Sequence, residues 1–360
     1  MPHIVGILVG GDGVRRLDAP PLIDGHVHDD AARPHGLDHL LGDQHRGFGS
    51  RQKHRADDQV GLLYRFGDVI AVGHRTSDNG FFEDMGIPYY SVDIENAKQF
   101  DVLPTDDIYA VAHFASSLPS RYEYNPRDLF ESITIGTLNV LEWMRKIGCK
   151  KIVFPQTPSD MASYHNCGKM IPEDAPREFP LTGDHAVYTI AKNAAVDLIE
   201  NYHAEYGFSR FVFRFFTIYE YHPNAYHYRN YKHLMMPFRM LMDRASKSLP
   251  IEIWGNCKKA KEMVYIKDFI RLVKLAIDSD IEGGIYNVGN GWQVSLEEQI
   301  LGIIKVFSPK DNPSPVIYVK DKPDPLENAF ESSKIKRDFG YEPLCTYIRQ
   351  LEDLKHDMET

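Results

Sequence analysis

The stretch Ile108-Tyr-Ala-Val-Ala-His-Phe114 decides the fold, together with the two segments that follow it. It is short, apolar and enriched in Ile, Val and Phe, which is typical of a buried strand. The next segment, Leu129 to Ile147, repeats apolar residues at intervals of three and four, as an amphipathic helix does. Lys151-Ile-Val-Phe154 then reads as a second buried strand. A strand, a crossover helix and another strand predict a parallel α/β sheet.

The same alternation continues on both sides of this unit. Asp68 to Val72 and Arg210 to Phe215 read as buried strands, and Tyr188 to Tyr206 has helical spacing. We therefore expect a Rossmann-like, doubly wound parallel sheet over residues 1–215, with the helix 188–206 included. Residues 216–360 are expected to form mainly a smaller substrate-binding lobe, with some segments returning to the sheet. There the pattern predicts helices at Pro237 to Ala245 and Asp268 to Asp278, and strands at Ile251 to Trp254, Ile285 to Val288 and Val316 to Val319.

Length and composition limit the classes of protein that fit. The chain has 360 residues, of which 43% are hydrophobic, so disorder over most of its length is excluded. A net charge of −10 predicts no basic surface for nucleic acid, and we expect no nucleic-acid partner. The four cysteines lack CxxC spacing, and neither a long apolar run nor a secretory leader is evident. We expect a cytoplasmic protein with no membrane partner.

The first 66 residues do not follow the strand-and-helix pattern. Only Ile4 to Val9 resembles a strand, and Asp18 to Arg55 is dense in Asp, His, Arg and Gly without an amphipathic period. Seven of the sixteen histidines fall within residues 1–54. Because this composition offers little for a core, we expect residues 10–66 to be atypical and loosely packed.

A tyrosine and a lysine four residues apart, Tyr188-Thr-Ile-Ala-Lys192, form the first candidate site. On a helix the two side chains share one face, and a nearby cation favours the phenolate, so this tyrosine is a candidate general acid or base. The same spacing occurs at Tyr228/Lys232 and Tyr318/Lys322, so spacing alone does not select a site. Only the first pair opens a long amphipathic helix after a polar loop and a buried strand.

Two further candidates follow the ends of strands. Thr157 lies just past the strand 151–154, where open α/β sheets bind ligands, and its hydroxyl can hydrogen-bond a substrate oxygen. A threonine that merely starts a turn before Pro158 is the alternative. The small residues of Ala112 to Ser120 (AHFASSLPS) follow another strand, where they let a flat cofactor approach the backbone, although loop packing explains them equally well.

In their order and spacing, these motifs resemble the extended short-chain dehydrogenase/reductase family, in its branch of NAD(P)-dependent sugar-nucleotide epimerases and dehydratases. The resemblance covers about residues 67–350. Other motifs that support it are Gly136 to Leu141, Ile171 to Pro176, Arg214 to Tyr219, Ile253 to Asn256, Val264 to Asp268 and Asn287 to Gly289. Carried over by motif, the resemblance implies that Thr157, Tyr188 and Lys192 are the catalytic residues.

The resemblance also implies a site for NAD or NADP. The glycine-rich turn of the family is split here, which indicates either a reading-frame disturbance across residues 10–66 or a genuine insertion; its remnants are Gly10, Gly11, Gly13, Gly47 and Gly49. Where an acidic residue would bind the ribose of NAD, His74 and Arg75 stand instead. Arg75 suits the 2′-phosphate of NADP, which favours NADP. The other implied cofactor positions are Asp93, Ile94, Phe114, Ala115 and Ser116, together with Tyr188 and Lys192.

The implied reaction is epimerisation, or simple reduction, at a hydroxyl-bearing carbon of a nucleotide-activated sugar. Tyr188 removes the hydroxyl proton while hydride passes to the nicotinamide, Thr157 hydrogen-bonds the same oxygen, and Lys192 lowers the pKa of the tyrosine. Dehydratases of the family carry Asp-Glu after the catalytic threonine, whereas Pro158 and Ser159 stand here, which disfavours dehydration. We expect a nucleotide-sugar substrate and a homodimer, with substrate contacts from Ser117, Thr217, His233 and Lys261.

Two alternatives stay open at this point. The chain can be a catalytically impaired relative that only binds a nucleotide. Leu22-Ile-Asp-Gly-His26-Val-His28 resembles the metal motif of amidohydrolases, in which two histidines on one strand face share a metal ion. That fold needs further ligands on later barrel strands, which the doubly wound pattern does not offer. We therefore expect no metal site.

Overall fold

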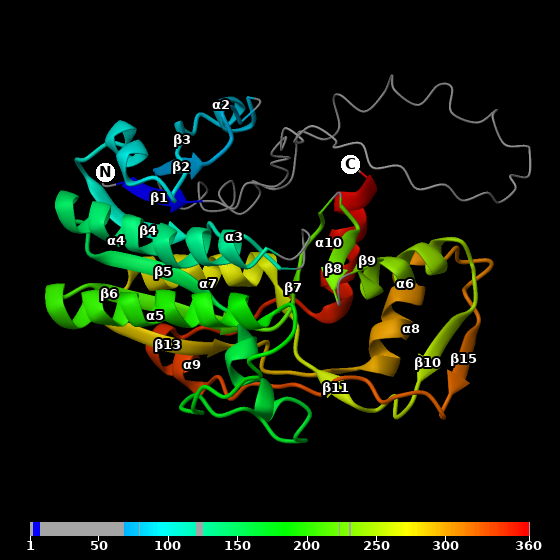
Figure 1. Ribbon diagram of the computed structural model, residues 1–360. Coiled ribbons are helices and arrows are strands. Elements are labelled where there is room, and N and C mark those ends of the chain that lie inside the picture. The colour runs from blue at the N-terminus through cyan, green and yellow to red at the C-terminus, as the bar shows by residue number, and fades with distance from the viewer. Residues whose placement is uncertain are drawn as a thin grey trace, which may run out of the picture.

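A seven-stranded sheet forms the centre of the computed structural model, which describes residues 3–7, 68–78, 80–119, 125–222, 224–229 and 232–359 (Figure 1). All neighbouring strands are parallel, in the order β13-β6-β5-β4-β1-β2-β3. The strands are β1 (His3–Ile7), β2 (Val69–Gly73), β3 (Tyr89–Ser91), β4 (Ile108–His113), β5 (Lys151–Gln156), β6 (Ser209–Phe215) and β13 (Gly283–Val288). The predicted parallel α/β sheet is confirmed.

Strand β1 pairs with β2 on one side and with β4 on the other. Ile4 is in register with Val69, and Val5 with Val111. The strand predicted at Ile4 to Val9 is thus confirmed for the part that the structure describes. Because the chain order changes direction beside β1, the carboxyl ends of β1 and β4 flank a topological switch point, where open α/β sheets bind ligands.

Side chains of alternate strand residues point to opposite faces of the sheet, and helices cover both faces. Val111, Ile152 and Val212 belong to the core under the helical layer of α3 (Pro126–Phe130), η2 (Glu131–Ile135), α4 (Gly136–Ile147) and α5 (Ala186–Tyr206). Ala110 and Val153 belong to the opposite core, which includes side chains of α2 (Phe81–Asp84), α7 (Ile266–Asp278) and α9 (Ser333–Phe339). The sheet is therefore doubly wound, as predicted.

The helix predicted at Leu129 to Ile147 starts earlier and is less regular. It begins at Pro126, which suits the first position of a helix, and Oδ1 of Asn125 accepts the N–H of Arg127 over 3.1 Å. A π turn, η2, separates α3 from α4. At Gly136 a Cβ atom would lie 2.6 Å from Cδ1 of Ile94, so glycine lets the helix approach the loop after β3.

A third core lies outside the large sheet. It is shared by α6 (Pro237–Ser246), α8 (Leu296–Phe307), α10 (Tyr347–Glu359) and the parallel pair β10 (Ile251–Trp254) and β15 (Val316–Val319) (Figure 1). The remaining strand pairs are β7 (Ile218–Tyr219) with β12 (Val264–Tyr265), β8 (Tyr226–Arg229) with β9 (Lys232–Met235), and β11 (Ala260–Lys261) with β14 (Val294–Ser295). Strand β13 and helix α7 return to the large sheet.

Candidate active site

Thr157 lies directly after β5, at the carboxyl edge of the sheet, and its side chain is buried. It caps the 3₁₀ helix η3 (Pro158–Tyr164), because its Oγ1 accepts the N–H of Ser159 over 3.2 Å. Since this bond uses the oxygen as acceptor, the hydroxyl proton stays available for donation. The turn-starting role and the ligand-facing role considered for Thr157 are therefore compatible.

Tyr188 and Lys192 lie one turn apart near the start of α5. Nζ of Lys192 lies 6.0 Å from the centroid of the Tyr188 ring and 4.4 Å from that of Phe154. It donates a hydrogen bond to the main-chain oxygen of Pro155 over 3.0 Å. Because Pro155 precedes Thr157 by two residues in the chain, this bond brings the Tyr188 helix to the strand that leads to Thr157.

Burial governs the ionisation of both residues. It raises the pKa of Tyr188, and it lowers the pKa of Lys192 from 10.5 to about 7. The pKa of Tyr188 is therefore raised, whereas the sequence motif predicts that the nearby lysine lowers it. The reason is that removal of the phenol from water disfavours its charged form, and the ammonium of Lys192, which burial disfavours as well, does not compensate for this. In the protein alone the phenol therefore keeps its proton.

The last residue of β4, His113, is fully buried close to this lysine. Its Nε2 lies 3.0 Å from Oγ1 of Thr137, whose hydroxyl donates to the carbonyl of Ile133, so Nε2 carries the proton. Among the described residues Nδ1 has no hydrogen-bond partner. Burial, and then the charge of Lys192, lower the pKa of His113 to about 3, so the imidazole is neutral.

A buried ion pair is formed by Asp160, three residues after Thr157, and Arg214 on β6. Asp160 is fully buried, and Arg214 reaches it with Nη2 at 2.8 Å from Oδ2 and Nε at 3.0 Å from Oδ1. Nη1 of Arg214 donates to Oδ1 of Asn287 over 3.0 Å, and Nδ2 of Asn287 donates to the carbonyl of Ile171 over 3.3 Å. Arg214 and Asn287 stand within motifs of the sequence, whereas a role for Asp160 was not predicted. The available signal was a carboxylate shortly after an apolar strand.

The implied cofactor positions after β4 and β3 lie at the carboxyl edge of the sheet, on strands separated by β1 and β2. Phe114, Ala115 and Ser116 follow β4 and are buried. Asp93 follows β3 and is half-buried; its main-chain N–H donates to Oε1 of Gln99 over 2.7 Å. Ile94 is buried and its carbonyl accepts Nδ2 of Asn139 over 2.8 Å, which ties it to α4.

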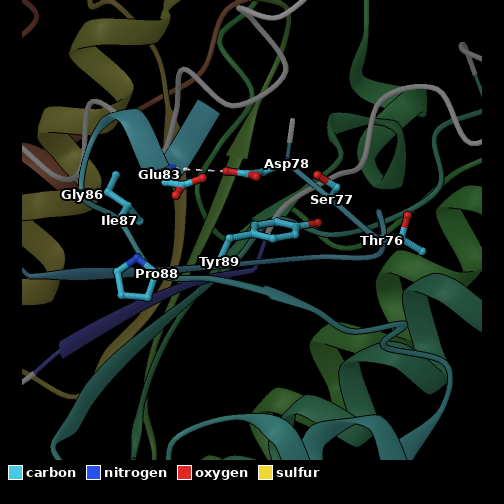
Figure 2. A pocket seen from close by; sticks show the side chains of 8 residues that line it. All are labelled: Thr76, Ser77, Asp78, Glu83, Gly86, Ile87, Pro88 and Tyr89. Atoms are coloured by element: carbon cyan, nitrogen blue, oxygen red, sulfur yellow. Dashed lines mark hydrogen bonds between the residues drawn. The ribbon is translucent and has the colours of Figure 1, made fainter. Parts of the chain in front are cut away.

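The loop after β2, from Thr76 to Asp78, lines a hollow of about 460 Å³. His74 and Arg75 follow this strand, and the carbonyl of Arg75 accepts the hydroxyl of Tyr89 over 2.9 Å. Figure 2 shows the lining side chains, among them the hydroxyls of Thr76 and Ser77 and the carboxylate of Asp78. That carboxylate caps the turn before α2, because it accepts the N–H groups of Gly80, Phe82 and Glu83.

The positions expected to contact substrate are spread over several elements. Ser117 follows β4, and its main-chain N–H donates to Oγ of Ser132 over 3.0 Å. Thr217 is exposed between β6 and β7, and its carbonyl accepts the N–H of Val264 over 3.0 Å. His233 is exposed on β9, outside the seven-stranded sheet.

Lys261 lies on β11, half-buried, and burial lowers the pKa of its ammonium group. The neighbouring Glu262 is buried, and its pKa is raised to about 7 by that burial although it accepts the N–H of Phe330 over 2.8 Å. Its carboxylate is so close to Gly289 that a Cβ atom there would lie 2.4 Å from Oε2. No role for Glu262 was predicted from the sequence.

Several predicted site residues lie outside the described residues. They are the glycines Gly10, Gly11, Gly13, Gly47 and Gly49, and the histidines His26 and His28 of the amidohydrolase alternative. The expected loose packing between Asp18 and Arg55 lies outside them as well. Within the described ranges, no helix is both long and apolar enough to cross a membrane.

The doubly wound sheet with its switch point defines a Rossmann-fold protein. The family model described as the NAD dependent epimerase/dehydratase family matches residues 59–289. The chain therefore belongs to this family, within the extended short-chain dehydrogenases/reductases, as the resemblance of its motifs implies. Membership of this family argues against the amidohydrolase alternative.

Relatives and solved structures agree with this assignment. The chain is 29% identical to UDP-glucuronate 4-epimerase of Thermodesulfobacterium geofontis over 221 residues, 60% of this chain and 62% of that protein. It is 28% identical to UDP-glucose 4-epimerase 4 of Oryza sativa subsp. japonica over 258 residues, 66% and 67% of the two chains. The crystal structure of UDP-glucuronic acid 4-epimerase from Bacillus cereus in complex with NAD shows the same fold, with a TM-score of 0.61 at 20% identity over 84% of this chain and 95% of that one.

Proposed function

We propose that this chain is an NAD(P)-dependent enzyme that epimerises, or reduces, a hydroxyl-bearing carbon of a nucleotide-activated sugar. The observation that supports this most is the hydrogen bond of 3.0 Å between Nζ of Lys192 and the carbonyl of Pro155. It joins the helix that carries Tyr188 to the strand that leads to Thr157. A phenol, an ammonium group and a hydroxyl are thereby grouped at the edge of the sheet where ligands bind.

The described residues fit a dinucleotide at this edge. Small buried side chains, Ala115 and Ser116, follow β4 next to the switch point, and Asp93 and Ile94 follow β3. When bound, the nicotinamide supplies the acceptor and donor of hydride. The residues proposed to hold the dinucleotide are His74, Arg75, Asp93, Ile94, Phe114, Ala115, Ser116, Tyr188 and Lys192, with Gly10, Gly11, Gly13, Gly47 and Gly49 at the pyrophosphate.

Each catalytic side chain has a role in this proposal. Tyr188 acts as the base in its phenolate form, after the phenol has lost the proton that burial otherwise retains. The phenolate oxygen then takes a proton from the sugar hydroxyl and later returns it. Thr157 donates its free hydroxyl proton to the same sugar oxygen. Lys192, with a pKa near 7, is partly charged at neutral pH and favours the phenolate in its charged form.

The residues after Thr157 support epimerisation or reduction over dehydration. Pro158 and Ser159 stand where the resemblance places the Asp-Glu pair of dehydratases. A side chain able to protonate a leaving hydroxyl is thus missing at these two positions. Among the relatives, dTDP-glucose 4,6-dehydratase of Xanthomonas campestris is 23% identical over 168 residues, so both reaction types occur in proteins similar to this chain.

For the cofactor we propose NADP ahead of NAD. Arg75 follows β2, the strand end at which the ribose 2′-position is read. The hydroxyls of Thr76 and Ser77 line the hollow beside it and can accept or donate hydrogen bonds (Figure 2). NAD is the alternative, because the family is described as NAD dependent.

The substrate is proposed to be held by side chains from several elements. Lys261 carries a half-buried ammonium group for the diphosphate of the nucleotide, and Ser117, Thr217 and His233 are proposed as further contacts. We also propose a homodimer in the cytoplasm.

Turnover of a set of nucleotide sugars tests the proposal. UDP-glucose, UDP-glucuronate, UDP-N-acetylglucosamine and dTDP-glucose are each incubated with the protein and with NAD or NADP, and the products are read by proton NMR. We expect one of them to be epimerised or reduced, and Tyr188→Phe to be inactive. Tight binding of dinucleotide without turnover of any sugar would favour the catalytically impaired relative instead.

A further inference from the structure

Gln156, the last residue of β5, is almost completely buried, with 2% of its surface exposed. Its Oε1 accepts the main-chain N–H of Thr157 over 2.9 Å. Its Nε2 donates to Oδ1 of Asn193 over 2.9 Å and to Oδ2 of Asp160 over 3.3 Å. A buried amide is costly unless its polar atoms are paired, and here both donors and the acceptor have partners.

The three partners of Gln156 all lie next to candidate site residues. Thr157 is itself a candidate catalytic residue, Asp160 belongs to η3, and Asn193 directly follows Lys192 on α5. The bond to Asn193 lies beside the bond from Lys192 to the carbonyl of Pro155. Two consecutive residues of β5 thus hold two consecutive residues of α5.

The orientation of the Gln156 amide is determined by its surroundings. Asp160 offers only acceptor atoms and the N–H of Thr157 can only donate, so Nε2 must face the carboxylate and Oε1 the main chain. The carboxylate is held in turn by Arg214, which donates to it from Nε and Nη2 at 2.8 to 3.1 Å. The Gln156 amide is therefore hydrogen-bonded to a carboxylate that an ion pair with Arg214 holds in place.

We infer that Gln156 is a positioning residue, which holds Thr157 and the helix of Tyr188 and Lys192 at the separation that the reaction requires. This inference rests on the proposed function. It assigns no contact with the substrate to Gln156. A displacement of about 1 Å between reacting groups costs roughly a hundredfold in rate, so a side chain that sets such a separation has a large effect without touching the ligand.

Replacement of Gln156 by methionine tests the inference, because methionine keeps the length of the side chain and removes all three hydrogen bonds. We expect Gln156→Met to lower kcat by roughly a hundredfold while KM changes by about threefold or less. The matched control is Gln350→Met on α10, where a glutamine that is 1% exposed loses its bond to the carbonyl of Cys345. It should keep kcat within about twofold of the wild type.

A second variant covers the case in which Gln156→Met does not fold. In Gln156→Glu the protonated carboxyl group can still donate to Asp160 and accept from Thr157, whereas the carboxylate cannot donate. Burial beside Asp160 raises the pKa of such a glutamate, so the ratio of variant to wild-type kcat should increase as the pH is lowered from about 8 to 6. A ratio that does not change with pH would contradict the inference.

A readout that does not need turnover separates this inference from the proposed function. The Nζ resonance of Lys192, assigned with Lys192→Arg, is titrated by NMR in the wild type and in all three variants. The groups near Lys192 that can contribute charge are His113 on β4 and Tyr188 on α5, with Asp160 and Arg214 beyond Gln156. We expect both Gln156 variants to shift the midpoint by about half a unit or more, and Gln350→Met to leave it in place.

The outcomes are then distinguishable. If the wild type turns over no nucleotide sugar, the proposed function fails and the Lys192 titration still decides the role of Gln156. If the Gln156 variants keep both the titration midpoint and, where turnover exists, a kcat within about threefold of the wild type, Gln156 does not position the site. An equal loss in Gln350→Met would show that any buried amide has the same effect, and would also overturn the inference.

Discussion

The ammonium of Lys192 donates a hydrogen bond of 3.0 Å to the carbonyl oxygen of Pro155, which joins helix α5 to strand β5. The bond is made in a buried place, where it compensates part of the cost of removing the lysine from water. It also fixes Tyr188 relative to Thr157, although these residues are far apart in the sequence.

Tyr188→Phe should abolish turnover and leave the fold intact, because only the hydroxyl is lost. The rate is measured with the nucleotide sugar that the wild type converts, and the fold by circular dichroism. Tyr318→Phe is the control: its exposed hydroxyl donates to Glu297, and the variant should keep nearly full activity. If Tyr188→Phe retained more than about a tenth of the wild-type rate, Tyr188 would not be the acid or base.

The buried lysine makes the stability of the protein depend on pH. The pKa of Lys192 is about 7 in the folded protein and about 10.4 in an unfolded chain, so between these values the unfolded state binds more protons. Its destabilising effect is therefore complete below pH 7 and disappears as the pH rises towards 10. Lys192→Met removes this effect, and its stability relative to the wild type should fall by up to about 1.4 kcal/mol per pH unit from pH 7 to 9. Urea unfolding at pH 7, 8 and 9 measures this; a difference that stays constant would contradict it.

Removal of one partner from the buried ion pair of Asp160 and Arg214 should destabilise the protein strongly. Asp160→Asn leaves the guanidinium without its buried carboxylate, and we expect a loss of about 3 to 5 kcal/mol in the free energy of unfolding. The double variant Asp160→Leu/Arg214→Met should lose clearly less, because it leaves no unpaired charge. In contrast, Glu131→Gln removes the exposed pair with Arg127 and should cost about 0.5 kcal/mol or less. Equal losses for the buried and the exposed pair would refute this account.

Arg75→Ala tests the choice of cofactor. If Arg75 binds a 2′-phosphate, the variant should bind NADP more weakly by about 1.5 to 3 kcal/mol and NAD almost unchanged. Fluorescence titration of the reduced nucleotides measures both affinities. The variant should keep the bond between Tyr89 and residue 75, because that bond uses the main-chain carbonyl. An equal loss for the two nucleotides would assign Arg75 to packing or to the pyrophosphate.

Periodicity predicted most strands of the sheet, but not the edge strand Tyr89–Ser91, which is only three residues long. Strands such as Val69–Gly73 are continuous apolar runs that differ clearly from the amphipathic helices between them. The ends were harder to predict: the helix expected from Leu129 begins at Pro126, where Asn125 supplies the cap and a π turn follows. Such details depend on single side-chain contacts, as at Gly136 against Ile94.

Only those residues of the candidate site that belong to recognisable motifs could be predicted from the sequence. Tyr188, Lys192 and Thr157 were found by their spacing, their context and the resemblance they support. Gln156 and Asp160 were not, because their partners Asn193 and Arg214 come from elements that only the fold brings together. The pKa of Lys192 likewise depends on burial in the folded protein, which no local pattern reports.

A mass spectrum of the nucleotide released when the purified protein is denatured shows directly whether the chain binds NAD or NADP. We expect about one NAD or NADP per chain, with the 2′-phosphate present if Arg75 acts as proposed. If the protein is purified without nucleotide, we expect added dinucleotide to raise its melting temperature clearly. No released nucleotide, together with a melting temperature that saturating NAD and NADP leave unchanged, would contradict the account.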